Sequence, residues 1–266
     1  MSKDKSVSNN NYKIEELHDD HNTSKLTKYE MFVTGRKSFG ALIIHELITT
    51  LISWIPGALG IFLRSRLYPI FLGNVGKNVI FGKGVDFRHP YKIQIGDNTV
   101  IDDNCLLDAK GSSNTGIKIG KHNFIGRNTI LSCKNGDIEL RDNVNIGFNC
   151  EIFSSSNVLL EDYTLLAAYC YIVGGGKYDL KDTGNPIAKQ PIFDDRGIVI
   201  EKNCWLGARV TVLDGATIGH DTAIGAASLV STNIPSSSIA VGIPASIIKT
   251  RECSRYKCSQ PGSTSN

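Results

Sequence analysis

The chain lacks several features that would place it in a familiar class at once. Its 266 residues contain no uninterrupted run of about 20 apolar residues, so no membrane-spanning helix is expected. Residues 1–30 are polar and mixed in charge, and they do not resemble a secretory signal peptide. The formal net charge is only +3 and is dispersed, which argues against a nucleic-acid partner. We therefore expect a cytoplasmic protein with one sizeable domain.

Disulfide bonds are not expected either, although the chain has seven cysteines. Cys253 and Cys258 lie in a polar tail without partners at a metal-ligand spacing. The remaining pattern is informative, because four cysteines share one position of the repeat described next. These four are predicted to be reduced, small core residues: Cys105, Cys150, Cys170 and Cys204.

A six-residue repeat begins at Val75 and is the strongest pattern in the chain. An aliphatic residue recurs every six positions, often followed by Gly, with a small residue four places on. Clear examples are "IGDNTV-IDDNCL" (95–106), "IGKHNF-IGRNTI" (119–130), "LRDNVN-IGFNCE" (140–151) and "LGARVT-VLDGAT-IGHDTA-IGAASL" (206–229). Three short strands and three turns form a coil of about 18 residues, and each coil buries its aliphatic residues by stacking on the next. Gly or Asn at the corners is expected to supply unusual backbone angles. The pattern predicts an all-β parallel β-helix, since a β-sandwich would alternate with a period of two.

The regions outside the repeat complete the predicted domain organisation. Residues 1–30 are expected to be a disordered tail, and 31–72 an apolar or amphipathic helical hairpin. The β-helix occupies 73–234 and is interrupted by a loop at 173–197. Residues 235–266 form a C-terminal segment and polar tail.

The apolar segment is "SFGALIIHELITTLISWIPGALGIFLRSRLYPIFLG" (38–73). Its Pro56-Gly57 break predicts two helices, near 41–54 and 58–71. Two compatible roles are open: the helices cap the end of the β-helix, or they lie on a membrane surface. In the membrane role Trp54 and Tyr68 are interfacial anchors. The cations that would face lipid headgroups are Arg36, Lys37, Arg64 and Arg66. The abundance of apolar residues favours peripheral attachment to the inner face of the cell membrane.

The end of the repeat carries a more specific signature, "IVIEKNCWLGARVTVLDGATIGHDTAIGAASLVSTNIPSSSIAVGIPASIIKTR" (198–251). Its stretches "WLGA" (205–208), "GAAS" (225–228) and "GIPA" (242–245) are similar in order and spacing to the end of the maltose, galactoside and xenobiotic O-acetyltransferases. Those enzymes belong to the hexapeptide-repeat acyltransferases, whose fold is a left-handed parallel β-helix. The resemblance covers roughly 75–251 and implies the same fold here, preceded by the N-terminal apolar helical segment.

The resemblance also implies a function. It indicates an acyltransferase that uses acetyl-CoA, or another acyl-CoA, as co-substrate and assembles as a homotrimer with active sites between subunits. The acceptor would be a sugar, and the apolar segment suggests a membrane-linked or surface glycan. Small corners and nearby cations are predicted to hold the coenzyme: Trp205, Gly207, Ala208, Ala226, Ala227, Pro244, Lys249 and Arg251. The alternative is a catalytically silent trimeric scaffold at the membrane.

In the resembled enzymes a loop histidine takes the acceptor proton, because an alcohol needs a nearby base to attack a thioester. The corresponding loop here, 173–197, contains no histidine. Tyr178 and Asp179 are the candidate substitutes, with Lys177 lowering the pKa of a neighbour. His122 and His89 are further candidates, although His89 is expected four coils, or about 19 Å, below the loop.

Two other roles for histidine are considered from the sequence. His220, in "IGHDTAIG", is expected to be a turn residue beside the coenzyme groove, and a base only as the alternative. A γ-type carbonic anhydrase shares the β-helix but needs three histidines around zinc. His89, His122 and His220 fall at different heights and columns, so no metal site is predicted.

Overall fold

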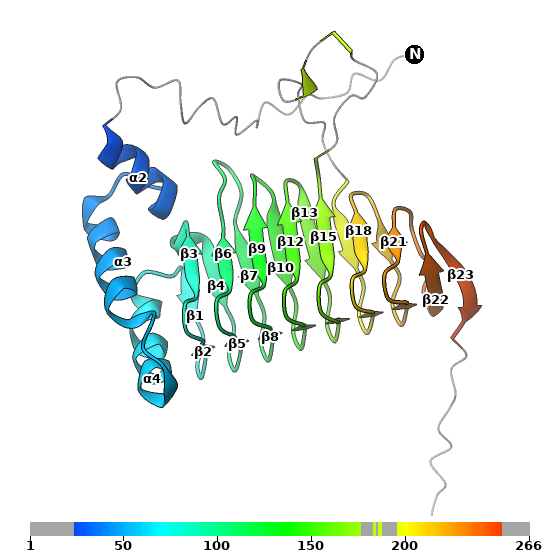
Figure 1. The fold of residues 1–266 in the computed structure, drawn as a ribbon, viewed down its shortest axis with the longest axis horizontal. Helices are drawn as coiled ribbons and strands as arrows, with labels where there is room; N and C mark the ends of the chain where they lie inside the picture. Colours follow the sequence, from blue (N-terminus) through cyan, green and yellow to red (C-terminus); the bar gives the residue numbers. More distant parts are fainter. Residues whose placement is uncertain (1–23, 177–182, 185, 188–195, 252–266) are drawn as a thin grey trace, which may run out of the picture.

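The computed structural model describes residues 24–176, 183–184, 186–187 and 196–251. In these residues a solenoid of stacked coils follows three N-terminal helices (Figure 1). Each coil contributes one short strand to each of three sheets, named A, B and C here. The predicted parallel β-helix is therefore confirmed.

The three sheets are built as follows. Sheet A contains β1 (Asn74–Val75), β4 (Ile93–Ile95), β7 (Ile117–Ile119), β10 (Asp137–Leu140), β13 (Asn157–Leu160), β16 (Ile198–Ile200) and β19 (Thr217–Ile218). Sheet B contains β2 (Ile80–Phe81), β5 (Val100–Ile101), β8 (Phe124–Ile125), β11 (Asn145–Ile146), β14 (Leu165–Leu166), β17 (Trp205–Leu206), β20 (Ala223–Ile224), β22 (Ser238–Gly242) and β23 (Ala245–Thr250). Sheet C contains β3 (Asp86–Arg88), β6 (Leu106–Asp108), β9 (Ile130–Cys133), β12 (Glu151–Ser154), β15 (Tyr171–Gly174), β18 (Thr211–Leu213) and β21 (Leu229–Val230). The chain runs from A to B to C in each coil, so the solenoid has three edges, which we call the A–B, B–C and C–A corners.

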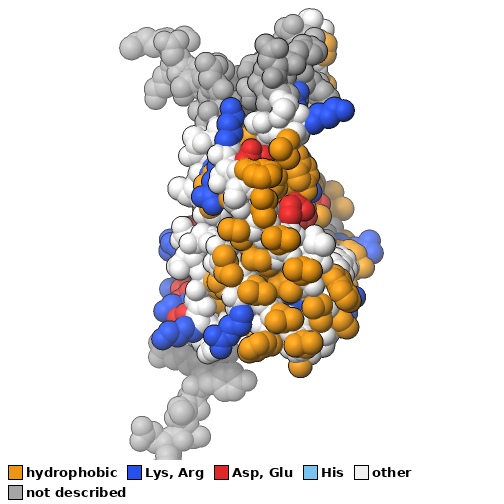
Figure 2. Space-filling model, turned by 90° about the vertical axis from the view of Figure 1, so that its left-hand side faces the viewer, with side chains coloured by type: hydrophobic (Ala, Val, Ile, Leu, Met, Phe, Trp, Pro, Cys, Tyr) orange, Lys and Arg blue, Asp and Glu red, His pale blue; other side chains and the backbone are white. Residues whose placement is uncertain are grey.

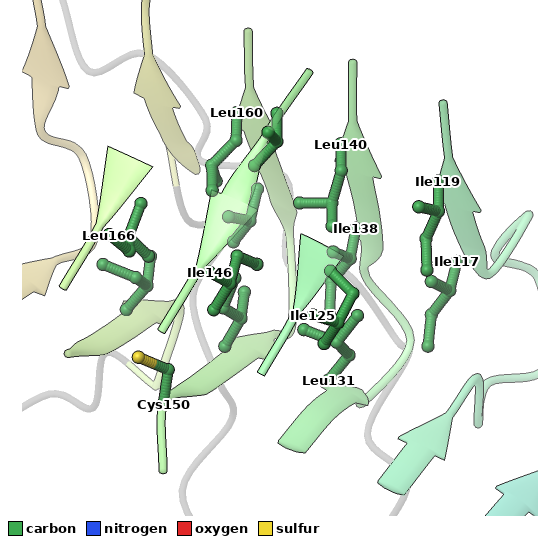
Figure 3. Packing of buried hydrophobic residues seen from close by; sticks show 14 of the residues in the cluster. Ile117, Ile119, Ile125, Leu131, Ile138, Leu140, Ile146, Cys150, Leu160 and Leu166 are labelled. Atoms are coloured by element: carbon green, nitrogen blue, oxygen red, sulfur yellow. The ribbon is translucent and has the colours of Figure 1, made fainter. Parts of the chain in front are cut away.

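Aliphatic side chains form the core as vertical ladders. Leu140 in β10 lies opposite Leu160 in β13 (Figure 3). Leu160 in turn lies opposite Ile200 in β16. All three are buried, and each such side chain contributes roughly 1.5–3 kcal/mol relative to an exposed one. Because a coil covers its ladder only with the neighbouring coils, stability accumulates along the stack.

The small residue of each repeat joins one coil to the next. The Thr129 hydroxyl donates to the Gly147 carbonyl at 3.1 Å, and the Cys150 thiol donates to the Ala167 carbonyl at 3.2 Å. The four cysteines predicted to be reduced core residues are all buried and unpaired, which confirms that prediction: Cys105, Cys150, Cys170 and Cys204.

Gly and Asn have different roles at the corners, although both were expected to supply unusual backbone angles. Asn128 does so, with φ 58°. Gly96 is not among the residues with positive φ; a Cβ built on it would lie 2.6 Å from the Gly120 carbonyl carbon in the next coil. Gly96 therefore allows close stacking of the two backbones, whereas other coils have Arg141 or Glu161 at the same repeat position.

The N-terminal end is helical. The helices are α2 (Lys25–Thr34), α3 (Phe39–Ile52) and α4 (Gly57–Leu67), with short 3-10 turns η1 (Tyr68–Ile70) and η2 (Pro90–Lys92). The helices predicted on either side of Pro56, near 41–54 and 58–71, agree closely with α3 and α4. The expectation of disorder up to residue 30 is wrong for residues 24–30, because Ser24 caps α2 by accepting a hydrogen bond from the Thr27 amide at 3.1 Å.

Two predicted membrane-facing residues are instead buried where the helices cap the first coil. The Tyr68 ring packs against Phe81 and Phe87 at centroid distances of 5.3 and 5.2 Å. Arg64 is 1% exposed, and its guanidinium donates to backbone carbonyls. Tyr68 is thus no interfacial anchor and Arg64 does not face headgroups, because the cap needs an aromatic core and a hydrogen-bond donor for its backbone carbonyls.

The opposite face of these helices remains apolar and open. Figure 2 shows hydrophobic side chains gathered over this end of the molecule. Its exposed large apolar residues are Phe39, Ile43, Ile44, Leu47, Leu51, Trp54, Leu59, Ile61, Phe62 and Ile70. We call this set the apolar platform. Arg36, Lys37 and Arg66 are exposed on the same helical segment. Among the described residues, no helix is both long and apolar enough to cross a membrane.

Candidate functional site

The small-residue corner predicted to hold the coenzyme lies in the last coils, at the B–C corner. Ala227 donates its backbone amide to the Ala208 carbonyl at 2.8 Å, so these residues are stacked directly. Ala226 and Ala227 are exposed and Ala208 is half-buried. Trp205 begins the adjoining strand β17, and its side chain is exposed on sheet B.

Gly207 differs from its neighbours because it is buried. A Cβ on Gly207 would lie 2.7 Å from the Ala226 amide nitrogen, so the next coil occupies the space that a side chain would fill. The absence of a side chain at Gly207 therefore serves stacking. Of the residues predicted to bind the coenzyme at this corner, the alanines and Trp205 are the accessible ones. Pro244 is also exposed, in the turn between β22 and β23; the neighbouring Gly242 amide donates to the Ser228 hydroxyl at 3.0 Å.

The predicted phosphate-binding cations lie at the other side of sheet B. Lys249 is opposite Ile239 in the β22–β23 pair, and its side chain is exposed. Arg251 donates from Nη1 to the Asp221 carbonyl at the A–B corner. The structure thus places the small residues and the cations on opposite edges of sheet B, with Trp205 on the face between them.

A histidine–carboxylate pair occupies that A–B corner. His220 Nδ1 lies 2.8 Å from Asp221 Oδ2, and the carboxylate also accepts a hydrogen bond from the Asn203 amide group. These bonds from Asn203 and His220 hold the pKa of Asp221 below its ordinary value. The His220 backbone amide donates to Glu201 Oε2 at 2.8 Å. The sequence analysis expected His220 to be a turn residue; the adjacent "HD" in the hexad was the signal of this pair.

The loop candidates Lys177, Tyr178 and Asp179 lie outside the described residues. The interruption itself starts later than predicted, because Val173 and Gly174 still pair with β12 as part of β15. Its ends lie at the C–A corner, where the Ser155 amide donates to the Gly174 carbonyl at 2.7 Å.

His89 and His122 are not brought to this loop. His89 is buried under α2, where Nε2 lies 3.1 Å from the Met31 carbonyl oxygen, and burial lowers its pKa to about 4. Its contacts assign it to docking α2 on the first coil. His122 is an exposed turn residue with φ 56° at an A–B corner, a different edge from the loop. Within the described parts of the chain, no group of three or more His, Cys, Asp or Glu side chains is arranged to hold a metal ion.

A polar groove on sheet A was missed by the sequence analysis. Two adjoining depressions of about 450 and 430 Å³ share Gln94, Lys118 and Glu139. Lys118 Nζ and Arg141 Nη1 lie 3.1 and 3.0 Å from Glu139 Oε1. Gln94, Lys118 and Glu139 are successive outward residues of β4, β7 and β10, so a polar residue between two aliphatic ones in each strand was the available signal.

The groove extends between two edges of the solenoid. Its lining includes Asn157 beside the C–A corner and Asp162 at the A–B corner. The donors and acceptors along it suit hydrogen bonding to hydroxyl groups.

Known proteins resemble this chain in sequence and fold. The family model for the bacterial transferase hexapeptide (six repeats) matches residues 197–232. The galactoside O-acetyltransferase of Lactococcus lactis is 31% identical over 117 residues, which cover 42% of this chain and 56% of that enzyme. The chain spans about half of the length of several curated relatives that it matches.

Solved structures support the fold. The polysialic acid O-acetyltransferase OatWY is 17% identical with a TM-score of 0.54, covering 67% of this chain and 86% of that one. AntD, an N-acyltransferase from Bacillus cereus in complex with dTDP and 3-hydroxybutyryl-CoA, is 22% identical with a TM-score of 0.51, covering 76% and 92%. With the repeat and the sequence relatives, they confirm that the chain is similar to the hexapeptide-repeat acyltransferases.

Proposed function

We propose that the protein is an acetyl-CoA-dependent O-acetyltransferase that acetylates a sugar hydroxyl group. The observation that carries this proposal is the exposed small-residue corner of Ala208, Ala226 and Ala227 beside Trp205, within the coils that match the family model. A long thioester co-substrate can lie against such a corner and accept hydrogen bonds from its backbone. Lys249, which is exposed on β23 of the same sheet, adds a positive charge that attracts the anionic co-substrate.

The sugar acceptor is supported by the galactoside O-acetyltransferase relative and by the polar groove on sheet A. The groove offers Lys118, Glu139 and Arg141 as hydrogen-bonding partners and contains no large exposed aromatic side chain in its lining. We propose that the acceptor glycan lies there.

A homotrimer is part of the proposal. The outward side chains of Leu165 and Trp205 are neighbours on sheet B and both are exposed, as is Phe124 in an earlier coil of the same sheet. A flat apolar row on a rigid solenoid is suited to contact with another copy. Light scattering on the purified protein should give three times the mass of the chain, and a monomer would contradict this part.

Attachment to the inner face of the cell membrane is the remaining part. It is supported by the apolar platform and by the exposed cations Arg36, Lys37 and Arg66, which would attract anionic lipids by about 1 kcal/mol each near the surface. A glycan carried on a lipid would then be the natural acceptor class.

The test is acetyl transfer by the purified chain. With acetyl-CoA and a panel of galactosides and lipid-linked glycans, we expect acceptor-dependent thiol release and an acetyl ester detected by mass spectrometry. Ala226→Trp should raise the KM for acetyl-CoA by about tenfold or more, because the indole fills the corner. Lys83→Trp is the matched control, since Lys83 holds the same repeat position at the B–C corner of the first coil.

The scaffold alternative is favoured by one observation, the absence of histidine from 173–197. It predicts that the trimer and membrane binding persist while no acceptor yields an acetyl ester. Acetyl transfer to any member of the panel excludes it.

A further inference from the structure

We infer that His220 is the general base of the acetyl transfer and that Asp221 is its positioning residue. This inference rests on the proposed function and supplies the base that the loop 173–197 lacks as histidine. The hydrogen bond of 2.8 Å between His220 Nδ1 and Asp221 Oδ2 carries it.

The geometry fixes the tautomer. A carboxylate can only accept, so Nδ1 carries the proton and Nε2 keeps its lone pair for an incoming hydroxyl group. Asn203 holds the same carboxylate from the previous coil, and Arg251 holds the Asp221 carbonyl. The low pKa of Asp221 keeps it ionised as the partner of an imidazolium. The His220 side chain is 45% exposed, so a substrate can reach it.

The other described histidines do not offer these properties. His45 and His89 are buried, and burial lowers the pKa of both. His122 is exposed, and no carboxylate lies within ion-pair distance of its ring in the described residues. His220 alone among these four combines an exposed ring with a bonded carboxylate.

The position of His220 connects the two proposed binding surfaces. The backbone carbonyl of Asp162, at the A–B end of the polar groove, accepts a hydrogen bond from the Asn203 backbone amide at 2.9 Å. The Asn203 side-chain amide in turn donates to Asp221 in the following coil. Two coil spacings, about 10 Å, therefore separate Asp162 from the pair. On the other side of the corner lies Trp205, whose strand pairs with β20, and β20 begins two residues after Asp221. An acceptor from the groove and a thioester beside Trp205 would meet at this corner.

The proposed step balances as follows. His220 Nε2 takes the proton of the sugar hydroxyl while the oxygen forms a bond to the acetyl carbonyl carbon. The carbon–sulfur bond of the thioester then breaks, and the departing thiolate takes the proton from the imidazolium. The products are the acetyl ester and free CoA, and His220 returns to its starting tautomer.

The test separates kcat from KM in full-length variants whose folding is checked by thermal unfolding. His220→Gln should lower kcat on the order of 100-fold with little change in either KM. His122→Gln, at the same type of corner in an earlier coil, is the matched control and should keep parental kcat. Asp221→Asn retains a residue suited to the φ of 60° and should lower kcat about tenfold or more, and Asp221→Glu should recover part of it.

Three outcomes would overturn the assignment. If His220→Gln keeps parental kcat but raises the KM for acetyl-CoA, the corner binds phosphate together with Lys249. If Tyr178→Phe or Asp179→Asn loses activity while His220→Gln does not, the base lies in the loop. An active parent with these results leaves the proposed function standing, whereas a parent without acetyl transfer overturns that function and this assignment together.

Discussion

The guanidinium of Arg64 donates a hydrogen bond of 2.9 Å to the carbonyl of Phe81, and so joins helix α4 to the first coil of the solenoid. The same side chain donates from Nη1 to the carbonyls of Ile52 and Ile55, at 3.2 and 2.7 Å. These carbonyls lie where α3 ends and turns toward α4. A charge in this cap is thus used to satisfy backbone groups that helix ends leave without partners.

Replacing Arg64 by Met should therefore destabilise the cap strongly. The carbonyls of Phe81 and Ile55 would lose this donor, whereas that of Ile52 still accepts a hydrogen bond from the Ile55 amide. At about 1–3 kcal/mol for each carbonyl left without a donor, we expect a loss of at least about 2 kcal/mol in the free energy of unfolding. Arg66→Met removes an exposed charge from the same helix and should change stability by less than about 0.5 kcal/mol. Urea unfolding of both variants measures the difference, and equal effects would contradict the assigned role.

Glycines at two positions should respond in opposite ways to the same substitution. Gly96→Ala places a methyl group 2.6 Å from the Gly120 carbonyl carbon, so the coils must move apart at a cost of about 1–3 kcal/mol. Gly40 lies in α3 with nothing within 4 Å of a built Cβ. Gly40→Ala should stabilise the protein by up to about 1 kcal/mol, because alanine is the better helix former. Thermal unfolding of the two variants reports the sign directly.

The repeat could be predicted from the sequence because the residue type at each repeat position corresponds to one kind of contact between coils. An aliphatic residue every six positions can be buried only by stacking coils, and the ladder of Leu140, Leu160 and Ile200 follows. The structure of the cap was harder to predict from the sequence. Tyr68 and Arg64 are residue types that are common in membrane anchors. They are core residues here because Tyr68 packs against Phe81 and Phe87 and Arg64 donates to backbone carbonyls.

The candidate site was predictable where a local motif specifies it. The small corner at Ala226 follows from "GAAS", but the burial of Gly207 depends on which residue the next coil places above it. The bond between His220 and Asp221 follows from their adjacency. Its link to Asn203 depends on the register of stacked coils, which residue types alone do not reveal.

Acidification should loosen α2 from the solenoid. Burial under α2 lowers the pKa of His89 from its ordinary 6.5 to about 4. Between these values the unfolded chain binds a proton that the folded chain does not, so stability falls as the pH decreases from 6.5 toward 4. The free energy of unfolding that is lost through protonation of His89 is fully present above pH 6.5 and amounts to at most roughly 3 kcal/mol.

Hydrogen exchange of the α2 amides at pH 5 and pH 7.5 measures this loosening. His89→Asn keeps a residue suited to the φ of 51° and removes the titrating ring. The α2 amides of this variant should show a smaller difference in opening free energy between the two pH values. An unchanged difference would assign the pH dependence to another group, of which His45 is the nearest in character because burial also lowers its pKa.

The buried cysteines should be inert toward thiol reagents while the protein is folded. Burial raises the pKa of Cys105 to about 12 and that of Cys204 to about 11, so few thiolates exist at neutral pH. In a variant with Cys253 and Cys258 replaced by Ser, an aromatic disulfide reagent should label no cysteine until denaturant is added. Rapid labelling in the native state would contradict the burial of these thiols.

The apolar platform should bind lipid bilayers through side chains that are not needed for folding. Leu51 and Trp54 are 63% and 65% exposed, so replacing both by Glu removes apolar surface from the membrane interface without opening the core. In flotation with vesicles containing anionic lipid, we expect the parent to float and the double variant to bind at least about tenfold more weakly. Ile248→Glu, which changes an equally exposed residue at the far end of the solenoid, should float like the parent.

High salt should weaken binding of the parent without abolishing it, since it screens Arg36, Lys37 and Arg66 but leaves the apolar contact intact. A parent that stays in the soluble fraction at low salt would show that the platform serves another partner.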